Sequence, residues 1–427
     1  MISKRKIINL SISLKIYKYL KYLHCQRIVL SRYLLHYLKV KKKVKKIVFI
    51  GQVNSIHFKS FFEKFKKYSV KGDSYEFLLI CSYPSYSLVQ EKGMKVIDLA
   101  NYYHPRQDDN FFNSWLDSLT FKARNILDQE YKNIRTTIEK FNPDILWIHD
   151  LQSGGYLIAD WIGEYTEERS QLKTIVTTYG NDLFLFYDHP VHKLKINQVL
   201  KSMDFIQIET ARDAFILENS EFSGEILPIS SATYRNFTEI NGKGDKCKSV
   251  KDIFLVVKGS THMRSSLIYF FEHVKQNHSF FFEKKIIVYG ATQEDVFFCE
   301  KLAYSYGVDI EFNREASNND FVKILERSVF SLNLNISDGV ANALVEGVKA
   351  GCVPIFSKNS GVLELLDLEY HQYVEFNPSE SNIGICNLLK LILDNNLTEI
   401  ILNNFLVNIR QYFDDTKYES IFDNILK

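Results

Sequence analysis

The sequence lacks the features that mark several common classes of protein. Its six cysteines are scattered, with no CxxC pair and no clustered histidines, so we expect reduced thiols and no structural zinc site. The longest uncharged run near the N-terminus, Ile7–Leu14, is far shorter than the roughly 20 apolar residues of a membrane-spanning helix. The apolar region and cleavage site of a signal peptide are also missing. These absences predict a cytoplasmic protein.

Acidic residues are absent from the first 48 positions. This part contains fourteen Lys or Arg residues, and because the whole chain carries a net charge of +2, the remainder carries −12. Basic residues alternate with Leu, Ile and Tyr up to residue 38, without Pro or Gly, and the run KVKKKVKK (Lys39–Lys46) follows. We predict a basic amphipathic helical arm over residues 1–45 that lies on an anionic membrane surface. One alternative is a helix packed on its own protein with a solvated basic face. The other is nucleic-acid binding, which is less favoured because no other part of the chain is strongly basic.

From Lys46 onward, short apolar runs alternate with helical patterns, as is typical of parallel, doubly wound α/β sheets. The runs before residue 230 are KIVFIG, YEFLLICS, KVIDLA, DILWIHD, KTIVTTYG and DFIQIET, with a long helix expected over residues 112–141. The runs after residue 250 are KDIFLVVKGS, KKIIVYG, VDIEFN, VFSLNLN and CVPIFS. The polar stretch between the two groups predicts a linker over residues 236–250. It separates α/β domains over residues 46–235 and 251–410, and a terminal helix is expected over residues 411–427.

The stretch SDGVANALVEGVKAGCVPIFS, which starts at Ser337, combines an apolar helix with regularly spaced polar residues. We expect Ser337 or Asp338 to cap the helix and Gly351 to end it in a left-handed conformation. Asp338, Asn342 and Glu346 are spaced by four, so on a helix they lie along one side. A carboxylate on a buried helix needs hydrogen-bond partners. Hydroxyl groups of a bound ligand would supply them.

The backbone at the start of this helix also suits a ligand. Gly339 allows another molecule to approach closely, and the N–H groups of Val340 and Ala341 form an anion site. Phosphate at the helix start and hydroxyls further along describe a nucleotide-sugar. The alternative is that Asp338 only caps the helix and Glu346 pairs with a Lys or Arg.

The order of these residues resembles the donor-binding motif of the retaining glycosyltransferases of family 4, which have the GT-B fold. In that motif two carboxylates eight positions apart bracket a Gly-containing helix start, followed by a small-residue AxG and a Val-Pro strand. The matching residues are Asp338, Gly339, Glu346, Ala350, Gly351, Val353 and Pro354. The sequence departs from the motif in having Asp at the first acidic position. The resemblance implies two Rossmann-like domains facing across a cleft, with Asp338 at the donor sugar and Glu346 at the ribose hydroxyls. It also implies that the helix over residues 411–427 crosses back to the first domain.

Lys258 and Arg264 stand six residues apart where a predicted strand ends. Two cations at such a junction suit a diphosphate leaving group, and ordinary surface charge is the alternative for either residue. Family 4 carries an Arg and then a Lys at this spacing, so the resemblance implies diphosphate contacts, with the bidentate guanidinium moved to the second position. The full set of donor contacts expected is Lys258, Gly259, Arg264, Gly339, Val340, Ala341, Asn342, Leu344 and Glu346.

Two segments of the first domain also resemble the family. DILWIHD is similar to its PDxxHxHD-type segment, whose His reaches the transferred sugar, so His149 is implied to be catalytic together with Asp338 and Glu346. An isolated His, by contrast, is more often structural. TTYGNDLF resembles the THGxD loop, with Tyr179 in place of His. The acceptor-side residues expected are Gly51, Asn54, Gly180 and Asp182.

Together with the resemblance, the sequence predicts a retaining glycosyltransferase that moves a sugar from a nucleotide-sugar to a glycan or lipid-linked acceptor in bacterial surface polysaccharide assembly. We expect peripheral attachment to the inner face of the cell membrane through residues 1–46, and no cofactor. No metal is expected, because Asp108–Asp109 lies in a loop-like region, Asp414–Asp415 lies in the tail, and no DxD-type motif stands at a predicted strand end. The alternative is a catalytically silent GT-B subunit that binds a partner or the membrane. A phosphorylase would need a pyridoxal lysine, for which the sequence gives no sign.

Overall fold

A computed structural model describes most of the chain beyond residue 43. The described residues are 44–52, 55–69, 75–82, 94–98, 134–231, 251–258, 267–290, 293–313, 318–335, 337–358, 361–376 and 384–426. The predicted arm up to residue 43, the predicted linker, and the candidate residues Asn54, Gly259 and Arg264 lie outside this set. So does most of the helix expected over residues 112–141, of which residues 134–141 are described and helical. Predictions that concern residues outside the described ranges stay predictions.

The first domain contains a parallel sheet of seven strands. The strands are β1 (Lys45–Gly51), β2 (Tyr75–Cys81), β3 (Met94–Asp98), β4 (Ile145–His149), β5 (Lys173–Thr177), β6 (Phe205–Gln207) and β7 (Glu225–Ile226). They lie in the order β3-β2-β1-β4-β5-β6-β7, and every neighbouring pair is parallel. The chain builds outward from β1 in one direction and then in the other. The topological switch point is therefore between β1 and β4.

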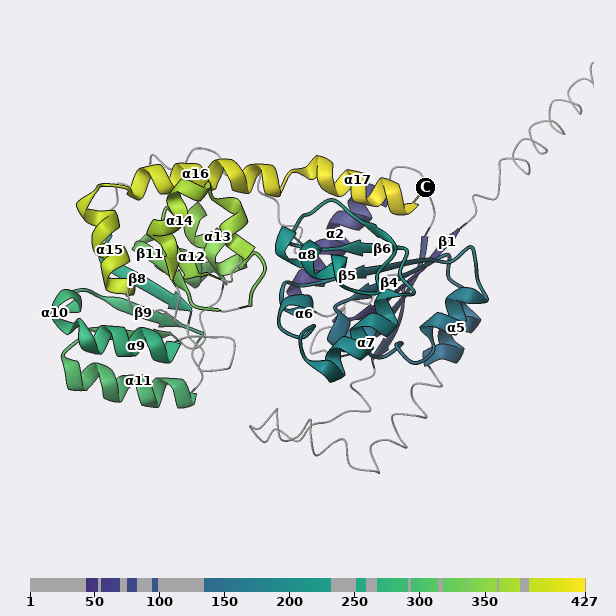
Figure 1. Cartoon of the computed structure of the whole chain (residues 1–427), viewed down its shortest axis with the longest axis horizontal. Helices are drawn as coiled ribbons and strands as arrows, with labels where there is room; N and C mark the ends of the chain where they lie inside the picture. The colour runs from purple at the N-terminus through teal and green to yellow at the C-terminus, as the bar shows by residue number, and fades with distance from the viewer. Residues whose placement is uncertain are drawn as a thin grey trace, which may run out of the picture.

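The second domain repeats this plan with six strands. They are β8 (Ile253–Lys258), β9 (Ile286–Tyr289), β10 (Ile310–Asn313), β11 (Ser328–Asn333), β12 (Val353–Ser357) and β13 (Glu375–Phe376). The order β10-β9-β8-β11-β12-β13 is again all parallel, so the switch point lies between β8 and β11. Two doubly wound sheets confirm the expected fold class of two Rossmann-like domains (Figure 1). The short strands β7 and β13 were not expected from the sequence.

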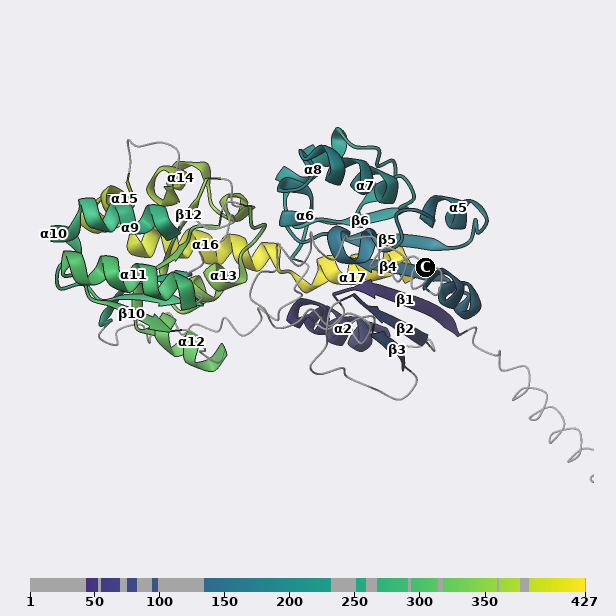
Figure 2. The same cartoon turned by 90° about the horizontal axis from the view of Figure 1, so that it is seen from below.

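Helices cover both faces of the first sheet, as its unbroken apolar strands predict. The helices of this domain are α2 (Ile56–Ser69), a π-helical turn (Leu151–Gly155), α5 (Ile162–Glu167), α6 (Asn181–Phe184), α7 (Pro190–Leu200) and α8 (Ala211–Glu218). One face packs against residues 134–141, α5, α7 and α8, through an aliphatic core. The opposite face packs against α2 through a core rich in Phe, which also contains Trp147, and Figure 2 shows α2 beside β1, β2 and β3.

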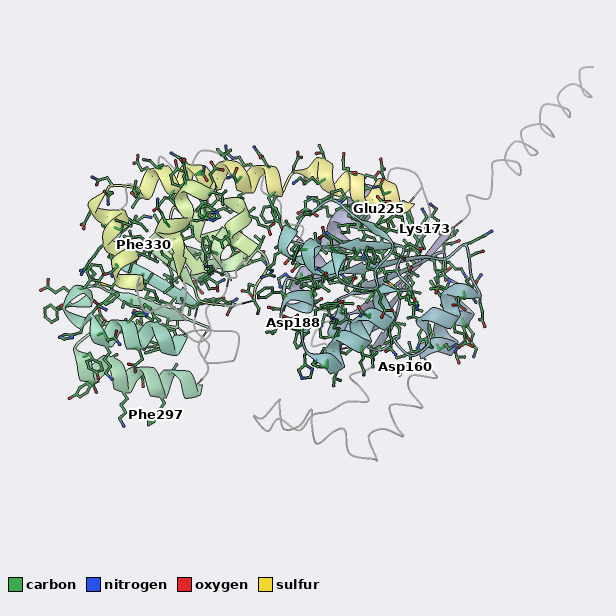
Figure 3. The ribbon with its side chains drawn as sticks, in the orientation of Figure 1. Asp160, Lys173, Asp188, Glu225, Phe297 and Phe330 are labelled. Atoms are coloured by element: carbon green, nitrogen blue, oxygen red, sulfur yellow. The ribbon has the colours of Figure 1, made fainter. Side chains whose placement is uncertain are left out.

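The second sheet is also covered on both faces. Its helices are α9 (Leu267–Gln276), α10 (His278–Phe281), α11 (Gln293–Tyr306), α12 (Asn318–Glu326), α13 (Asn342–Lys349), a 3-10 turn (Gly361–Leu365), α14 (Leu368–Val374), α15 (Ile385–Asp394) and α16 (Thr398–Tyr412). Most of them share one core with Phe330 of β11, while Phe321 and Leu325 of α12 pack on the opposite face. Phe330 is fully buried, whereas Phe297 of α11 is 75% exposed and points away from the domain (Figure 3).

The last helix, α17 (Asp415–Leu426), returns to the first domain. Figure 1 shows α16 and α17 running one after the other along the same side of both domains. Tyr418 and Phe422 of α17 are buried in the aromatic core beside Phe61 and Trp147. The C-terminus is therefore part of the core of the first domain, although residues 253–412 build the second.

The helix of the donor-like motif begins later than predicted. α13 starts at Asn342 with Ala341 at the N-cap in an extended conformation, so the prediction that Ser337 or Asp338 caps it is wrong. Residues 337–341 instead form a loop between β11 and α13. Asp338 is therefore not on the helix, and only Asn342 and Glu346 share a helical face. Gly351 follows the helix with φ +79°, which confirms its predicted left-handed conformation.

Candidate active site between the two domains

The carboxyl ends of the central strands of both sheets face each other. In the first sheet Gly51 ends β1 beside His149, which ends β4. In the second sheet Lys258 ends β8, and the loop after β11 carries Asp338. Hydrogen bonds and close contacts join these edges across the domain boundary, as described below. Ligands of doubly wound sheets bind at this edge, next to the switch point.

Lys258 and Asp338 form an ion pair at the edge of the second sheet. Lys258 Nζ lies 3.8 Å from Asp338 Oδ2, with side chains 41% and 17% exposed. The same Asp338 oxygen accepts hydrogen bonds from the side-chain amides of Asn335, at 2.5 Å, and Asn333, at 3.5 Å. A cation predicted to hold the diphosphate and a carboxylate predicted to hold the sugar are thus brought together. A long, partly exposed pair of this kind is weak and is easily exchanged for ligand contacts.

The N-terminal ends of two helices meet at the domain boundary. Asn342, at the start of α13, places its amide nitrogen 3.4 Å from Nδ1 of His57, in the first turn of α2. Both helix starts carry positive partial charge and direct backbone N–H groups outward. Glu346 lies one turn after Asn342 on the same face and is half-buried. Positive partial charge at the helix starts suits a phosphate, and the carboxylate of Glu346 suits hydroxyl groups.

Gly339 makes a close backbone contact, but its neighbour is the protein itself. A β-carbon on Gly339 would lie 2.5 Å from a carboxylate oxygen of Glu209 and 3.0 Å from the α-carbon of Gly180. A β-carbon on Gly180 would lie 1.9 Å from the backbone nitrogen of Gly339. The two glycines therefore allow the domains to touch, and the donor contact expected at Gly339 and the acceptor contact expected at Gly180 stay predictions.

Other predicted donor and acceptor residues are part of the protein interior. Val340, Ala341 and Leu344 are buried, with Leu344 1% exposed in the core of the second domain, so its side chain is not available to a ligand. Gly51 has φ +128°, and a β-carbon there would lie 1.9 Å from the carbonyl oxygen of His149. Its role in the structure is to let the ends of β1 and β4 approach each other.

His149 is fully buried. Its ring is surrounded by Phe49, Phe58, Phe61 and Trp147, with ring centroids 4.6 to 5.9 Å away. Nδ1 lies 3.3 Å from the hydroxyl of Tyr179, and Nε2 has no hydrogen-bond partner among the described residues. Burial lowers the pKa of His149 to about 3, so its imidazole is neutral. The expectation that His149 itself reaches a sugar does not fit this enclosure. Tyr179 and His57 lie between His149 and the second domain, and the centroids of their two rings are 5.6 Å apart.

Two buried carboxylates fix the loops at the edge of the first sheet. Asp182 Oδ2 accepts the backbone N–H groups of Leu151, at 3.1 Å, and Tyr179, at 3.2 Å. Asp150, at φ +66°, accepts the N–H groups of Ser153 and Gly154. Burial raises the pKa of Asp150 to about 6, and burial together with the nearby Asp150 raises the pKa of Asp182 well above its usual range. Asp182, predicted to contact the acceptor, is therefore turned inward.

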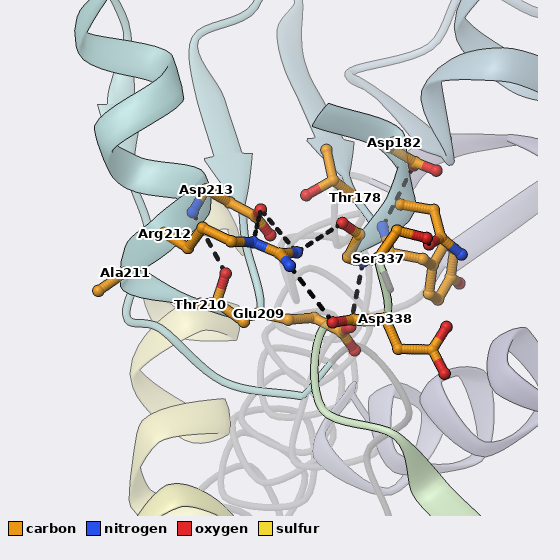
Figure 4. Close-up of polar contacts among 12 residues, drawn as sticks. Thr178, Asp182, Glu209, Thr210, Ala211, Arg212, Asp213, Ser337 and Asp338 are labelled. Carbon is orange, nitrogen blue, oxygen red and sulfur yellow. Dashed lines mark hydrogen bonds and ion pairs between the residues drawn. The ribbon is translucent and has the colours of Figure 1, made fainter. Parts of the chain in front are cut away.

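Three residues at the domain boundary were not expected to belong to it. They are Glu209, Arg212 and Glu364. Glu209 and Arg212 follow the carboxyl end of β6, and Figure 4 shows Arg212 directed from α8 toward Asp338. Ligands gather at the carboxyl ends of parallel strands. Applying this rule to β6, as to the neighbouring strands, would have identified Glu209 and Arg212. No sequence signal distinguishes Glu364 from other surface acids.

No group of three or more His, Cys, Asp or Glu side chains that could hold a metal ion occurs within the described ranges. Among the same residues, no helix is long and apolar enough to cross a membrane.

Comparison with known proteins shows similarity at the level of the fold. No protein-family model matches the sequence, and no curated protein matches it. Sucrose-phosphate synthase from Thermosynechococcus elongatus superposes with a TM-score of 0.62 at 10% identity, covering 90% of this chain and 98% of that one. HepE from Anabaena, solved in complex with UDP-glucose, gives 0.58 at 11% identity over 89% and 99% of the two chains. The lipopolysaccharide outer core galactosyltransferase WaaB gives 0.55 at 12% identity over 89% and 99%. The chain thus has the GT-B fold.

Proposed function

We propose that this protein is a glycosyltransferase that takes its sugar from a nucleotide-sugar donor. The observation that carries the proposal is the pairing of Lys258 with Asp338 beside the switch point of the second sheet, next to the start of α13. One group suits a diphosphate and the other suits sugar hydroxyls. The chain superposes on HepE, which was solved with UDP-glucose, and on WaaB, which is described as a galactosyltransferase. Both similarities support the same class of reaction.

Each side chain has a proposed role in donor binding. Lys258, with Arg264 outside the described residues, neutralises the diphosphate as the bond to the sugar breaks. The helix starts at His57 and Asn342 add positive partial charge at the same place. Glu346 holds the ribose hydroxyls and Asp338 holds the transferred sugar. His57, which touches the second domain, replaces the enclosed His149 as the imidazole that faces the donor.

The proposed reaction retains the configuration of the sugar and needs no metal ion. Retention rests on the resemblance of the Asp338–Glu346 motif to family 4, and metal independence rests on the absence of a DxD-type motif at a predicted strand end. Removal of divalent ions with EDTA is expected to leave the rate of transfer unchanged, and a loss that Mg²⁺ or Mn²⁺ restores would contradict metal independence. Nuclear magnetic resonance of the anomeric proton in the product reports the configuration.

The proposed acceptor is a lipid-linked glycan of bacterial surface polysaccharide assembly, reached at the inner face of the cell membrane. The basic residues 1–46 support this proposal, because each Lys or Arg near an anionic surface contributes about 1 kcal/mol of binding. WaaB, named for a lipopolysaccharide, has the same fold. Salt-sensitive binding to anionic liposomes that is lost on deleting residues 1–38 is expected. The truncated protein must keep its melting temperature, and full-length protein that ignores such liposomes at low salt would refute the attachment.

The test of the donor proposal is a screen of nucleotide-sugars for thermal stabilisation, followed by hydrolysis of the best one without acceptor. Stabilisation by one nucleotide-sugar with slow hydrolysis is expected. Hydrolysis also separates the enzyme from the second candidate, a catalytically silent GT-B subunit, which would bind without turnover. Stabilisation by none of the nucleotide-sugars would refute the proposal.

A further inference from the structure

The loop that carries Asp338 is held by the other domain. Here the donor loop means residues 337–341. Ser337 Oγ hydrogen-bonds the side chain of Asn181 at 2.5 Å, and Gly339 is pressed against Gly180 without room for a β-carbon on either. The donor loop is therefore in contact with the first domain over at least three consecutive residues, and its position depends on how the domains meet.

Arg212 links the two sides of this contact. Its Nη2 donates to the carbonyl oxygen of Gly180 at 2.8 Å, and its Nη1 donates to the carbonyl oxygen of Asp338 at 3.4 Å (Figure 4). Asp213 Oδ1 holds the other edge of the guanidinium, and the ring of Phe184 lies 3.9 Å below it. The side chain is only 18% exposed. A planar group with five donors in a fixed fork can satisfy acceptors on two domains at once, whereas the three donors of a lysine all radiate from one nitrogen.

The 3-10 turn after β12 adds a second link. Its carboxylate, Glu364, accepts the N–H groups of Ala211 and Arg212 at 2.7 and 3.0 Å, at the start of α8 in the first domain. Its first residue, Gly361, donates its N–H to the carbonyl oxygen of Asp338 at 3.2 Å. The same carbonyl thus accepts from both Gly361 and Arg212. Glu364 is solvent-exposed, so we expect its contribution to be the smaller one.

These contacts connect the two domains through one carbonyl group. The carbonyl oxygen of Asp338 accepts hydrogen bonds from Arg212 of the first domain and from Gly361 of the second. Glu364, in the same turn as Gly361, accepts the N–H groups at the start of α8, the helix that carries Arg212. We infer that Arg212 is a positioning residue, supported by Glu364, that holds the donor loop in register with the first domain. Only one part of the inference rests on the proposed function, namely that this position of the donor loop serves sugar transfer. The positioning itself can be tested without a substrate.

Hydrogen–deuterium exchange tests the positioning without any substrate. In Arg212→Ala, amide exchange in peptides covering residues 337–344 is expected to rise about tenfold, since one charge-assisted contact of roughly 1.5 kcal/mol is lost. Glu364→Ala should raise it less, and the double variant should be non-additive, because both side chains act on one loop. Arg212→Lys should recover part of the protection.

The matched controls are Arg327→Ala, which breaks an exposed ion pair with Asp252 at the amino end of the second sheet, and Glu369→Ala on the surface of α14. Neither is expected to alter exchange in the donor loop. Faster exchange confined to α8 would overturn the inference, because Arg212 and Glu364 would then stabilise only that helix. Equal acceleration in the controls would overturn it as well.

Steady-state kinetics with the nucleotide-sugar found in the thermal screen test the consequence for transfer. Arg212→Ala is expected to lower kcat about tenfold with a smaller change in donor KM, because Lys258 and Glu346 still hold the donor. A general loss of folded protein would lower the amplitude of the melting transition instead. A change in KM alone would overturn the positioning role. If no nucleotide-sugar binds, the proposed function fails, but the exchange experiment still decides whether Arg212 positions the loop.

Discussion

Acidic side chains stand at the carboxyl edge of both sheets, in different surroundings. In the first domain Asp150 and Asp182 are buried, and their oxygens accept backbone N–H groups from the adjoining loops. Asp213 is buried as well, and its Oδ1 faces the guanidinium of Arg212. Asp150 and Asp182 therefore satisfy buried N–H groups of the loops, and Asp213 pairs with a neighbouring cation.

In the second domain the acids are partly exposed rather than fully buried. Asp338 is 17% exposed and bonds to side chains, namely Asn335, Asn333 and Lys258. Glu346 is half-buried on the face of α13 that carries Asn342. Side-chain contacts near the surface can be exchanged for a ligand at little cost, whereas buried backbone contacts cannot. The comparison teaches that the first domain uses its acids to build the shape of the site, while the second keeps its acids for binding.

The largest effect is expected from Asp182→Ala. This change leaves the buried N–H groups of Leu151 and Tyr179 without an acceptor, at a cost of about 2–5 kcal/mol in the free energy of unfolding. Urea unfolding measures it. Asp182→Asn keeps an oxygen in place and should lose much less, and Asp188→Ala, an exposed acid six residues on, should be neutral. A neutral Asp182→Ala would show that this acid does not build the site.

The second prediction concerns the pH dependence of stability. Burial raises the pKa of Asp213 from 3.8 to about 6, although Arg212 opposes this. Between these two values the folded protein keeps a proton that the unfolded chain has lost, so this carboxyl makes stability fall as pH rises from about 4 to about 6, by at most about 3 kcal/mol.

The variant Asp213→Asn isolates this contribution. Its free energy of unfolding, subtracted from that of the wild type, should leave a difference that declines over the same pH window and is level above it. A difference that rises with pH would mean that Arg212, and not burial, dominates the pKa of Asp213.

The third prediction concerns the accessible acids. Glu346→Gln should reduce affinity for the nucleotide-sugar roughly tenfold to a hundredfold, as expected for a lost charged hydrogen bond, and leave the melting temperature unchanged. Isothermal titration calorimetry measures the affinity, and Glu326→Gln at the exposed end of α12 is the control. Wild-type affinity in Glu346→Gln would remove Glu346 from the site, and a lowered melting temperature would make it a structural acid like Asp182.

The sheets were predictable because their strands are continuous apolar runs. KIVFIG and DILWIHD are buried on both faces as β1 and β4, and each lies within one residue of the predicted bounds. The start of α13 was not predictable in the same way. Asp338 has the composition of a helix cap, but its carboxylate bonds to Asn335 and Lys258, which a local pattern does not reveal.

The candidate site was predictable only where a residue's role is local. Lys258 was expected at a strand end and Asp338 at the donor sugar, and their side chains lie 3.8 Å apart. His149 was expected in the site, but its burial depends on Phe58 and Phe61 of α2, an element with no fixed spacing from it. Gly180 and Gly339 meet because the two domains pack together, and this contact between distant segments has no signature in either segment alone.

The smallest effect is expected from breaking the ion pair of the second domain. Lys258→Ala should change the free energy of unfolding by less than about 1 kcal/mol, because the pair is long and partly exposed. Asp338 keeps its hydrogen bonds to Asn335 and Asn333, so no buried charge is left unpaired. Urea unfolding of Lys258→Ala beside Arg327→Ala, which breaks another exposed pair, makes the comparison direct. Losses of similar size to that of Asp182→Ala would mean that the second domain also uses this acid to hold its loop, and the distinction between building and binding acids would fail.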